Sequence, residues 1–289
     1  MAPHTPQRSE HAGEAGRAPR SLLVDATGVR FDAPRSARRI VSLIPSTTET
    51  LCRLGLADAL VGVTAYCVEP AAVVRTKTRI GGEKNPDLER IRGLMPDLVI
   101  ANVEENLREH VETLRGWGIS VWVTYPRTVL EAIRMVRELG AVTGAADAAS
   151  GLADELERLY DEVSAETSRR TPVPVLYPIW RNPYMTINRD TYIHDVLRVT
   201  GGDNVFGDRA ERYPTITLDE MAARAPAVIV LPDEPFRFRR AHLADFAPYA
   251  DVPAVRDGRI HLMDGKPFSW HGPRVADALR TLPDLFRRS

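Results

Sequence analysis

Short apolar runs alternate with amphipathic stretches along the first half of the chain. A hairpin comes first, because the runs at 22–24 and 29–31 flank Gly28 in a turn. Buried strands are predicted at 39–44, 60–63, 97–101 and 119–124. Helices are predicted from Pro45 onward, at 88–94 and at 105–117. Strands that alternate with helices in this way indicate a parallel sheet covered by helices.

The second half repeats this plan, with predicted strands at 173–177, 227–231 and 259–262 and helices at 192–199 and 218–224. Two pairs of segments are also alike in sequence. The stretch 49–55 parallels 195–201, and 86–100 parallels 217–230. Two such matches in the same order predict a pseudo-symmetric pair of lobes.

The segment Asp147 to Arg169 lies between the halves and predicts one long helix. It contains no proline, and its apolar side chains recur at helical spacing on one face: Leu152, Leu156, Leu159, Tyr160 and Val163. At 1.5 Å per residue it would extend about 35 Å. We therefore predict an α/β protein of two Rossmann-like lobes joined by one long helix, with a ligand cleft between them. The predicted boundaries are 1–20 for a disordered tail, 21–142 and 172–289 for the lobes, and 143–171 for the helix.

Composition supports a globular binding protein and removes several alternatives. The 289 residues are 44% hydrophobic and 27% charged, enough for a core in each lobe. A net charge of −1 provides no field that would attract nucleic acid. The two cysteines, Cys52 and Cys67, form no CxxC motif, which excludes a disulfide framework or a structural zinc site. One bridge or two free thiols remain open.

The first twenty residues are polar and contain no apolar run of the kind that a secretory signal needs. They predict a disordered tail and a cytoplasmic protein; the alternative is an extracytoplasmic protein whose true start lies upstream. No stretch is apolar for long enough to span a bilayer. Enzyme and nucleotide-binding motifs are absent, including GxSxG, HExxH and GxxxxGK[ST]. We expect a monomeric binding protein that is not an enzyme.

Several motifs resemble those of the class III periplasmic substrate-binding proteins, the helical-backbone metal receptors. They are Arg39–Leu43 followed by Pro45–Glu49, then Gly62-Val63-Thr64, Asn85–Glu89 and Pro96–Ile100. The resemblance covers roughly residues 22 to 285. It implies two lobes on a long helix and the function of a substrate receptor for an ABC-type importer. The implied cargo is a metal chelate, a corrinoid such as cobalamin first and a ferric siderophore or haem next, with no intrinsic cofactor.

The resemblance also implies that each lobe docks on a membrane permease through a glutamate. By position in the repeated motif, these residues are Glu89 and Glu220. The alternative is that each is a surface acid that stabilises the N-terminal end of a helix.

Ligands of doubly wound lobes bind beyond the carboxyl ends of the strands. The loops predicted there supply our candidate ligand-binding residues: Tyr66, Cys67, Glu83, Lys84, Trp180, Arg181, Tyr184, Trp270, His271 and Arg274. Aromatic faces would stack on a flat chelate, and arginines would meet its acidic periphery. His271 could be an axial metal ligand, or it could only form a hydrogen bond or cap. Each residue also has a structural explanation, such as core packing for Trp180 and Cys67 or a surface charge for Arg274.

Two other functions remain open from the residues. A cytosolic sensor or chaperone for a metal chelate would keep the same fold without transport. An enzyme of unknown reaction could use Glu83 with Glu104-Glu105 as a carboxylate pair, although no further residue marks such a site.

Overall fold

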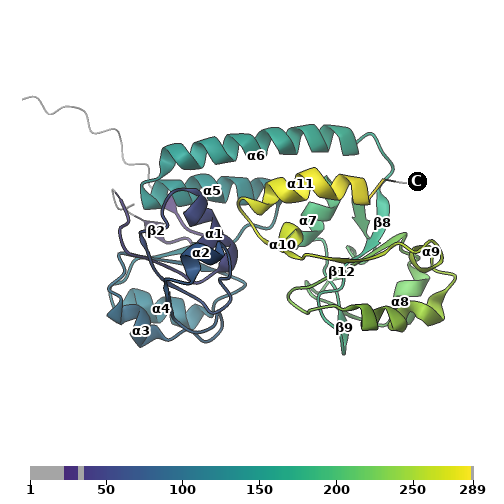
Figure 1. The fold of residues 1–289 in the computed structure, drawn as a ribbon, viewed down its shortest axis with the longest axis horizontal. Coiled ribbons are helices and arrows are strands. Elements are labelled where there is room, and N and C mark those ends of the chain that lie inside the picture. Colours follow the sequence, from purple (N-terminus) through teal and green to yellow (C-terminus); the bar gives the residue numbers. More distant parts are fainter. Residues whose placement is uncertain (1–22, 32–35, 288–289) are drawn as a thin grey trace, which may run out of the picture.

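The computed structural model describes residues 23–31 and 36–287. Figure 1 shows two lobes bridged along one side by helices, the longest of which is α6 (Ala146–Thr167). This is the helix expected over Asp147–Arg169. The two-lobed α/β fold with parallel sheets is confirmed. The predicted tail, residues 1–20, lies outside the described residues.

The N-terminal lobe is built on a five-stranded parallel sheet in the order β5-β4-β3-β6-β7. Its strands are β3 (Ile40–Ser42), β4 (Leu60–Val63), β5 (Thr78–Arg79), β6 (Leu98–Asn102) and β7 (Val121–Thr124). The helices between them are α1 (Pro45–Arg53), α2 (Ala71–Val74), α3 (Leu88–Gly93) and α4 (Arg108–Gly116), and α5 (Val129–Thr143) follows β7. The short antiparallel pair β1 (Leu23–Val24) and β2 (Arg30–Phe31) is the predicted hairpin.

Alternation along these strands decides which helices cover which face, because successive side chains point to opposite sides of a sheet. Ile40, Leu98 and Ile100 pack with α1 and α5 in one buried cluster. Val41 and Val99 pack with α3 and α4 in another. The lobe is therefore a three-layer sandwich.

The C-terminal lobe has a four-stranded parallel sheet in the order β10-β8-β12-β13. Its strands are β8 (Val173–Leu176), β10 (Gly202–Asn204), β12 (Val228–Pro232) and β13 (Ile260–Met263), and β9 (Tyr184–Met185) pairs with β11 (Thr215–Ile216) outside it. The helices are α7 (Tyr192–Val199), α8 (Leu218–Ala223), the 3-10 segment η1 (Arg240–Tyr249), α9 (Pro253–Arg256), α10 (Lys266–Ser269) and α11 (Arg274–Leu285).

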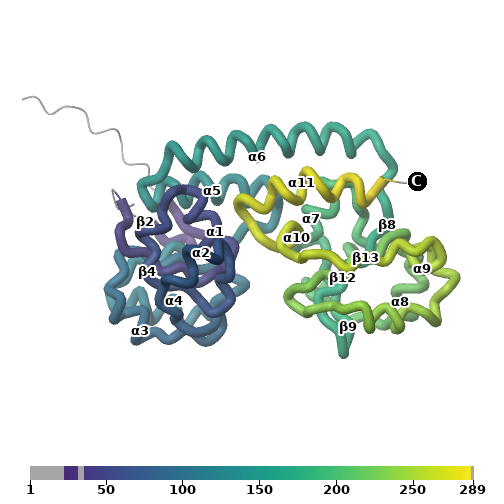
Figure 2. The backbone as a smooth tube through the Cα atoms, in the orientation of Figure 1, coloured from purple at the N-terminus to yellow at the C-terminus, as the bar shows by residue number. Residues whose placement is uncertain are grey.

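One hydrophobic core runs through both lobes along the helical layer. Val228 and Val230 of β12 face the same cluster as Leu156 of α6 and Leu139 of α5, which also contains Ile100 of the N-terminal sheet. Figure 2 shows α6 running across both lobes, along α5 on the N-terminal side and along α11 on the C-terminal side. Since these helices share their core with both sheets, the lobes are not independently packed bodies.

Candidate ligand-binding cleft

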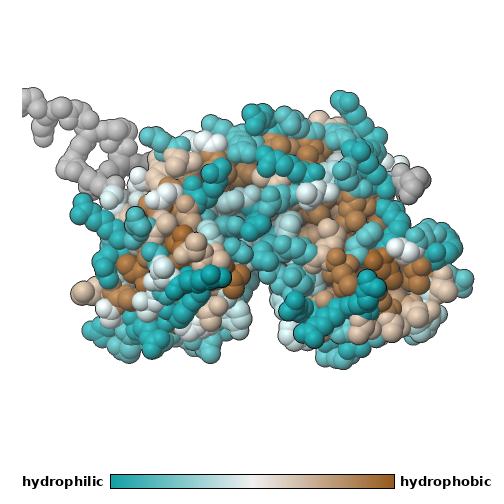
Figure 3. Space-filling view, viewed as in Figure 1, coloured by the Kyte–Doolittle hydropathy of each residue, from teal (hydrophilic) through white to brown (hydrophobic). Residues whose placement is uncertain are grey.

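The carboxyl ends of both sheets meet between the lobes. Figure 3 shows a hollow there on the side of the molecule opposite α6. The loops after β5 and β6 contribute from one lobe, and the loops after β12 and β10 contribute from the other. In parallel sheets, this edge is where ligands bind.

Three side chains connect the two lobes across this space. Arg212, in the loop between β10 and β11, donates from Nε to Oε1 of Glu104 at 2.8 Å. The hydroxyl of Tyr213 donates to the same oxygen at 2.5 Å. The Arg212 guanidinium also lies 5.4 Å from the ring centre of Tyr125. We call Glu104, Arg212 and Tyr213 the inter-lobe clasp.

Carboxylates from both lobes make the cleft acidic. The pKa of Glu83 is raised to about 7, first by burial and then by the nearby charge of Glu105; Lys84 lowers it, and Glu234 of the opposite lobe adds a smaller increase. Burial is also the main cause that raises the pKa values of Glu105 and Glu234. The Ser269 hydroxyl donates to Glu234 at 2.8 Å and partly offsets that shift. These groups take up protons at higher pH than ordinary carboxylates do.

The basic side chains at the cleft are already bound to protein groups. The Lys84 ammonium donates to the backbone carbonyl of Glu104. Lys266 lies 3.2 Å from Asp264 and 5.8 Å from the ring centre of Trp270. The Arg212 guanidinium is likewise held, by the carboxylate of Glu104.

Arg181 and Arg274 were predicted to meet acids at the edge of a ligand, but each is held by protein carboxylates. Arg181 donates to Asp245 at 2.6 and 3.0 Å. Arg274 joins α11 to α1 through Glu49 at 2.9 Å and also contacts Asp277 at 3.2 Å. A guanidinium in such a pair would have to give up a charge-assisted hydrogen bond before it could bind a ligand.

The four aromatic residues among the predicted ligand-binding residues separate into two pairs. Tyr66 is 62% exposed and Trp180 is 45% exposed, one in each lobe. Trp180 contacts Phe236 edge to face at 5.5 Å. Tyr184 and Trp270 are only 9% and 7% exposed, and the Tyr184 hydroxyl donates to Asp245 at 2.6 Å. Tyr66 and Trp180 thus retain free faces for stacking, whereas Tyr184 and Trp270 pack in the protein.

Cys67 and His271 also lie in packed surroundings. The Cys67 thiol is fully buried, with the hydroxyls of Thr48 and Thr64 each at 3.1 Å, and burial raises its pKa. The His271 ring meets Tyr192 at 4.4 Å, and burial lowers its pKa to about 4. Across the described ranges, no three His, Cys, Asp or Glu side chains group as a metal site. Axial ligation by His271 stays a prediction, and no contact here supports it.

Comparison with known proteins identifies the family to which this chain belongs. The family model described as "periplasmic binding protein" matches residues 40–267. The chain belongs to the periplasmic binding protein family. Members of this family are binding proteins.

Curated relatives and solved structures agree on this fold. The vitamin B12-binding protein of Photorhabdus laumondii is 28% identical over 73% of this chain and 76% of its own length. The periplasmic vitamin B12-binding protein BtuF of Vibrio cholerae superposes with a TM-score of 0.77 at 22% identity, covering 86% of this chain and 96% of that one. A periplasmic heme-binding protein of Pseudomonas aeruginosa gives 0.74 at 26% identity, covering 86% and 92%.

The prediction of a cytoplasmic protein is wrong, because the matching family and its structural neighbours are periplasmic binding proteins. The polar segment that motivated the prediction lies outside the described residues. Within the described part of the chain, no helix is long and apolar enough to cross a membrane.

The two predicted docking acids differ in their surroundings. Glu89 is exposed in the first turn of α3. Glu220 closes a capping box with Thr217 at the start of α8 and pairs with Arg209. Helix capping also shows that the equivalent of Glu89 is Asp219, because each residue is the second after its N-cap, Asp87 or Thr217. Asp219 is exposed and accepts a hydrogen bond from Tyr249 at 2.9 Å.

The sequence reasoning missed the inter-lobe clasp and the part played by Glu234. Glu234 follows a predicted strand, so its position at the cleft could have been inferred. Arg212 and Tyr213 lie in an irregular loop with no strand or helix signal beside them. Their role depends on contacts with Glu104, more than a hundred residues away in the chain.

Proposed function

We propose that this protein is the substrate receptor of an ABC-type importer and binds a corrinoid in the cleft between its lobes. The curated relatives named vitamin B12-binding proteins support this cargo. So does the presence of exposed aromatic side chains in both lobes, Tyr66 and Trp180, where a flat chelate would be enclosed.

The observation that favours a corrinoid over haem as the cargo is the set of carboxyl groups that line the cleft. Glu83, Glu105 and Glu234 face it from both lobes, while Lys84, Lys266 and Arg212 are held by protein groups. A corrin ring carries primary amides, whose N–H groups donate to carboxylates. The carboxylates of haem would instead meet the carboxyl groups of Glu83, Glu105 and Glu234 there.

The first experiment is a calorimetric titration of the purified protein with cyanocobalamin and, separately, hemin. We expect cyanocobalamin to bind more tightly and to be recovered with an unchanged visible spectrum, as fits a receptor without catalytic activity. Tighter binding of hemin would refute the corrinoid assignment. If a ferric siderophore alone binds, the receptor function stands with a different cargo.

Variants at the exposed aromatic residues test whether the corrinoid binds in the cleft between the lobes. Trp180→Ala should weaken cyanocobalamin binding about 10- to 100-fold, since a stacked aromatic contributes roughly 1–3 kcal/mol. Trp117→Ala is the matched control, because Trp117 stacks on Arg92 outside the cleft. Equal affinities for the parent and Trp180→Ala, with both folded by circular dichroism, would remove Trp180 from the site.

We further infer that Glu89 and Asp219 present the loaded receptor to its permease. Both carboxylates are exposed, and their helices, α3 and α8, lie at the far ends of the two lobes from α6 (Figure 1). The Glu220 carboxylate is occupied by Arg209 and by the helix cap, so it is less available to a partner.

A further inference from the structure

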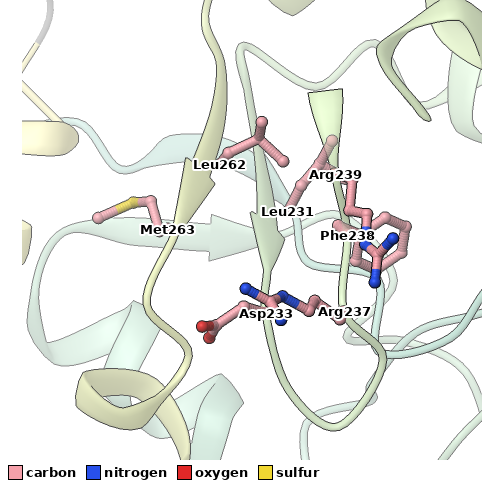
Figure 4. A pocket seen from close by; sticks show the side chains of 7 residues that line it. All are labelled: Leu231, Asp233, Arg237, Phe238, Arg239, Leu262 and Met263. Carbon is pink, nitrogen blue, oxygen red and sulfur yellow. The ribbon is translucent and has the colours of Figure 1, made fainter. Parts of the chain in front are cut away.

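A second cavity opens on the C-terminal lobe at the carboxyl ends of β12 and β13. Its volume is about 420 Å³. Figure 4 shows the residues that line it: Leu231, Asp233, Arg237, Phe238, Arg239, Leu262 and Met263. None of the residues that line this cavity is among the predicted ligand-binding residues, and the family match assigns the cavity no role.

The cavity combines an apolar floor with basic side chains. Leu231 and Leu262 are register partners on neighbouring strands, and Phe238 is buried beside them. Leu262 is nevertheless 41% exposed, so part of this apolar floor faces solvent. An uncovered apolar surface inside a cavity favours an apolar ligand group.

The arginines come from an alternating segment, Phe236 to Arg240, that reads Phe-Arg-Phe-Arg-Arg. Phe236 and Phe238 pack together with ring centres 4.9 Å apart, which turns Arg237 and Arg239 outward to exposed positions that line the cavity. Among the ion pairs found within 23–31 and 36–287, none includes Arg237 or Arg239.

One carboxylate also lines the cavity. Asp233 accepts a hydrogen bond from the backbone N–H of Gly265 at 2.9 Å. Two guanidinium groups against this single carboxylate leave the lining positively charged. The cleft next to it has the opposite sign. A guanidinium group can bind phosphate or carboxylate oxygens through two parallel hydrogen bonds.

The cavity adjoins the proposed cleft. Asp233 follows β12 directly, and the next residue, Glu234, is close enough to Glu83 of the opposite lobe to raise its pKa. A ligand held between the lobes could therefore reach the cavity with a side arm.

We propose that this cavity binds an anionic arm of the cargo, an apolar ring joined to a phosphate, with Arg237 and Arg239 contacting the phosphate oxygens and the ring resting on Leu231, Leu262 and Phe238. This inference rests on the proposed corrinoid function. It assigns the neutral, amide-bearing body of the chelate to the acidic cleft and its anionic arm to the basic cavity.

Two corrinoids that differ in this arm provide the test. Cyanocobalamin carries a ring-and-phosphate arm, and dicyanocobinamide lacks it. The double variant Arg237→Ala/Arg239→Ala should bind cyanocobalamin at least about tenfold more weakly and dicyanocobinamide as the parent does. Arg240→Ala is the matched control, because Arg240 belongs to the same basic run but does not line the cavity. It should leave both affinities unchanged.

Equal losses for the two corrinoids, or no loss for either, would overturn the subsite and leave the receptor function standing. If neither corrinoid binds the parent protein, the proposed function fails, and ligand binding by the cavity is tested separately. α-Ribazole phosphate, the free arm, should then give saturation-transfer NMR signals with the parent that disappear in the double variant. No signal with the parent would overturn the proposal.

Discussion

Three glutamates at the cleft are held in surroundings that disfavour their charge. Glu83, Glu105 and Glu234 are partly buried, and each has a raised pKa for that reason. A protein does not gain stability by burying carboxylates in this way. Their presence on both walls is instead useful for a ligand that brings hydrogen-bond donors, because the donors replace lost water.

The raised pKa of Glu83 predicts a pH-dependent stability. The folded-state pKa of about 7 lies above the ordinary glutamate value of 4.5, so between these values the folded protein holds a proton that the unfolded chain releases. Stability should therefore fall as pH rises from about 5 to 8. In Glu83→Gln this loss should shrink, giving a melting temperature several degrees above the parent at pH 8 and a smaller gain at pH 5.

Calorimetric melting at both pH values checks this. Glu109→Gln, which removes an exposed acid of α4, is the control and should follow the parent. A constant difference between Glu83→Gln and the parent at all pH values would show that Glu83 ionises normally.

At the scale of elements, α3 and α8 occupy matching positions in the two lobes. Each is a six-residue helix with a side-chain N-cap, Asp87 or Thr217, and each leads through a short turn into a central strand, β6 or β12. The backbone repeats even in detail, since Met95 and Ala225 before those strands both adopt positive φ, 46° and 45°. In this repeat the residue equivalent to Glu89 is Asp219, and not Glu220.

If Glu89 and Asp219 contact the permease, the double variant Glu89→Ala/Asp219→Ala should bind cyanocobalamin as the parent does and abolish its uptake by cells that contain the protein's own importer. The reason is that both carboxylates are exposed at helix starts, away from the cleft carboxylates. The double variant Glu89→Ala/Glu220→Ala tests the two docking residues that the sequence predicted. A stronger uptake defect in that second variant would return the docking role to Glu220.

At the scale of the molecule, the two lobes are joined on the helical side and touch again at the clasp. On the helical side, the backbone N–H of Val129 donates to Asp195 at 2.8 Å, and Arg274 binds Glu49 at 2.9 Å. These contacts and the shared core resist a large hinge motion. The contact of Glu104 with Arg212 and Tyr213 lies at the cleft itself, so it is the contact that a cargo between the lobes would disturb.

Glu104→Gln should loosen the cleft, because it removes the charge that both Arg212 and Tyr213 contact. Spin labels attached through Arg108→Cys and Ala223→Cys, in a Cys52→Ser background, report the separation of the lobes. We expect a broader and longer distance distribution in Glu104→Gln without ligand. Glu211→Gln, which changes an exposed neighbour of Arg212, should match the parent. Identical distributions in all three proteins would show that the clasp does not hold the lobes.

The sequence by itself determined the parallel sheets, the long helix and the family. Buried strands such as β6 and β12 are largely continuous apolar runs. A run of this kind is typical of a strand in a parallel sheet that is covered on both faces. The short strand β10 escaped prediction for the opposite reason. β10, Gly202–Asn204, has no apolar side chain and is a strand only because β8 pairs with it.

Only the tertiary structure decided which of the candidate loop residues are exposed and which are packed or paired. Trp180 and Trp270 both follow or precede regular elements, yet one is exposed and the other buried, because exposure depends on what packs against each ring. Arg181 and Arg274 pair with Asp245 and Glu49, partners that are distant in sequence, and their contact with a ligand stays a prediction. Periodicity records the local burial of a strand or helix, whereas charge pairing and cavities depend on which segments meet in space.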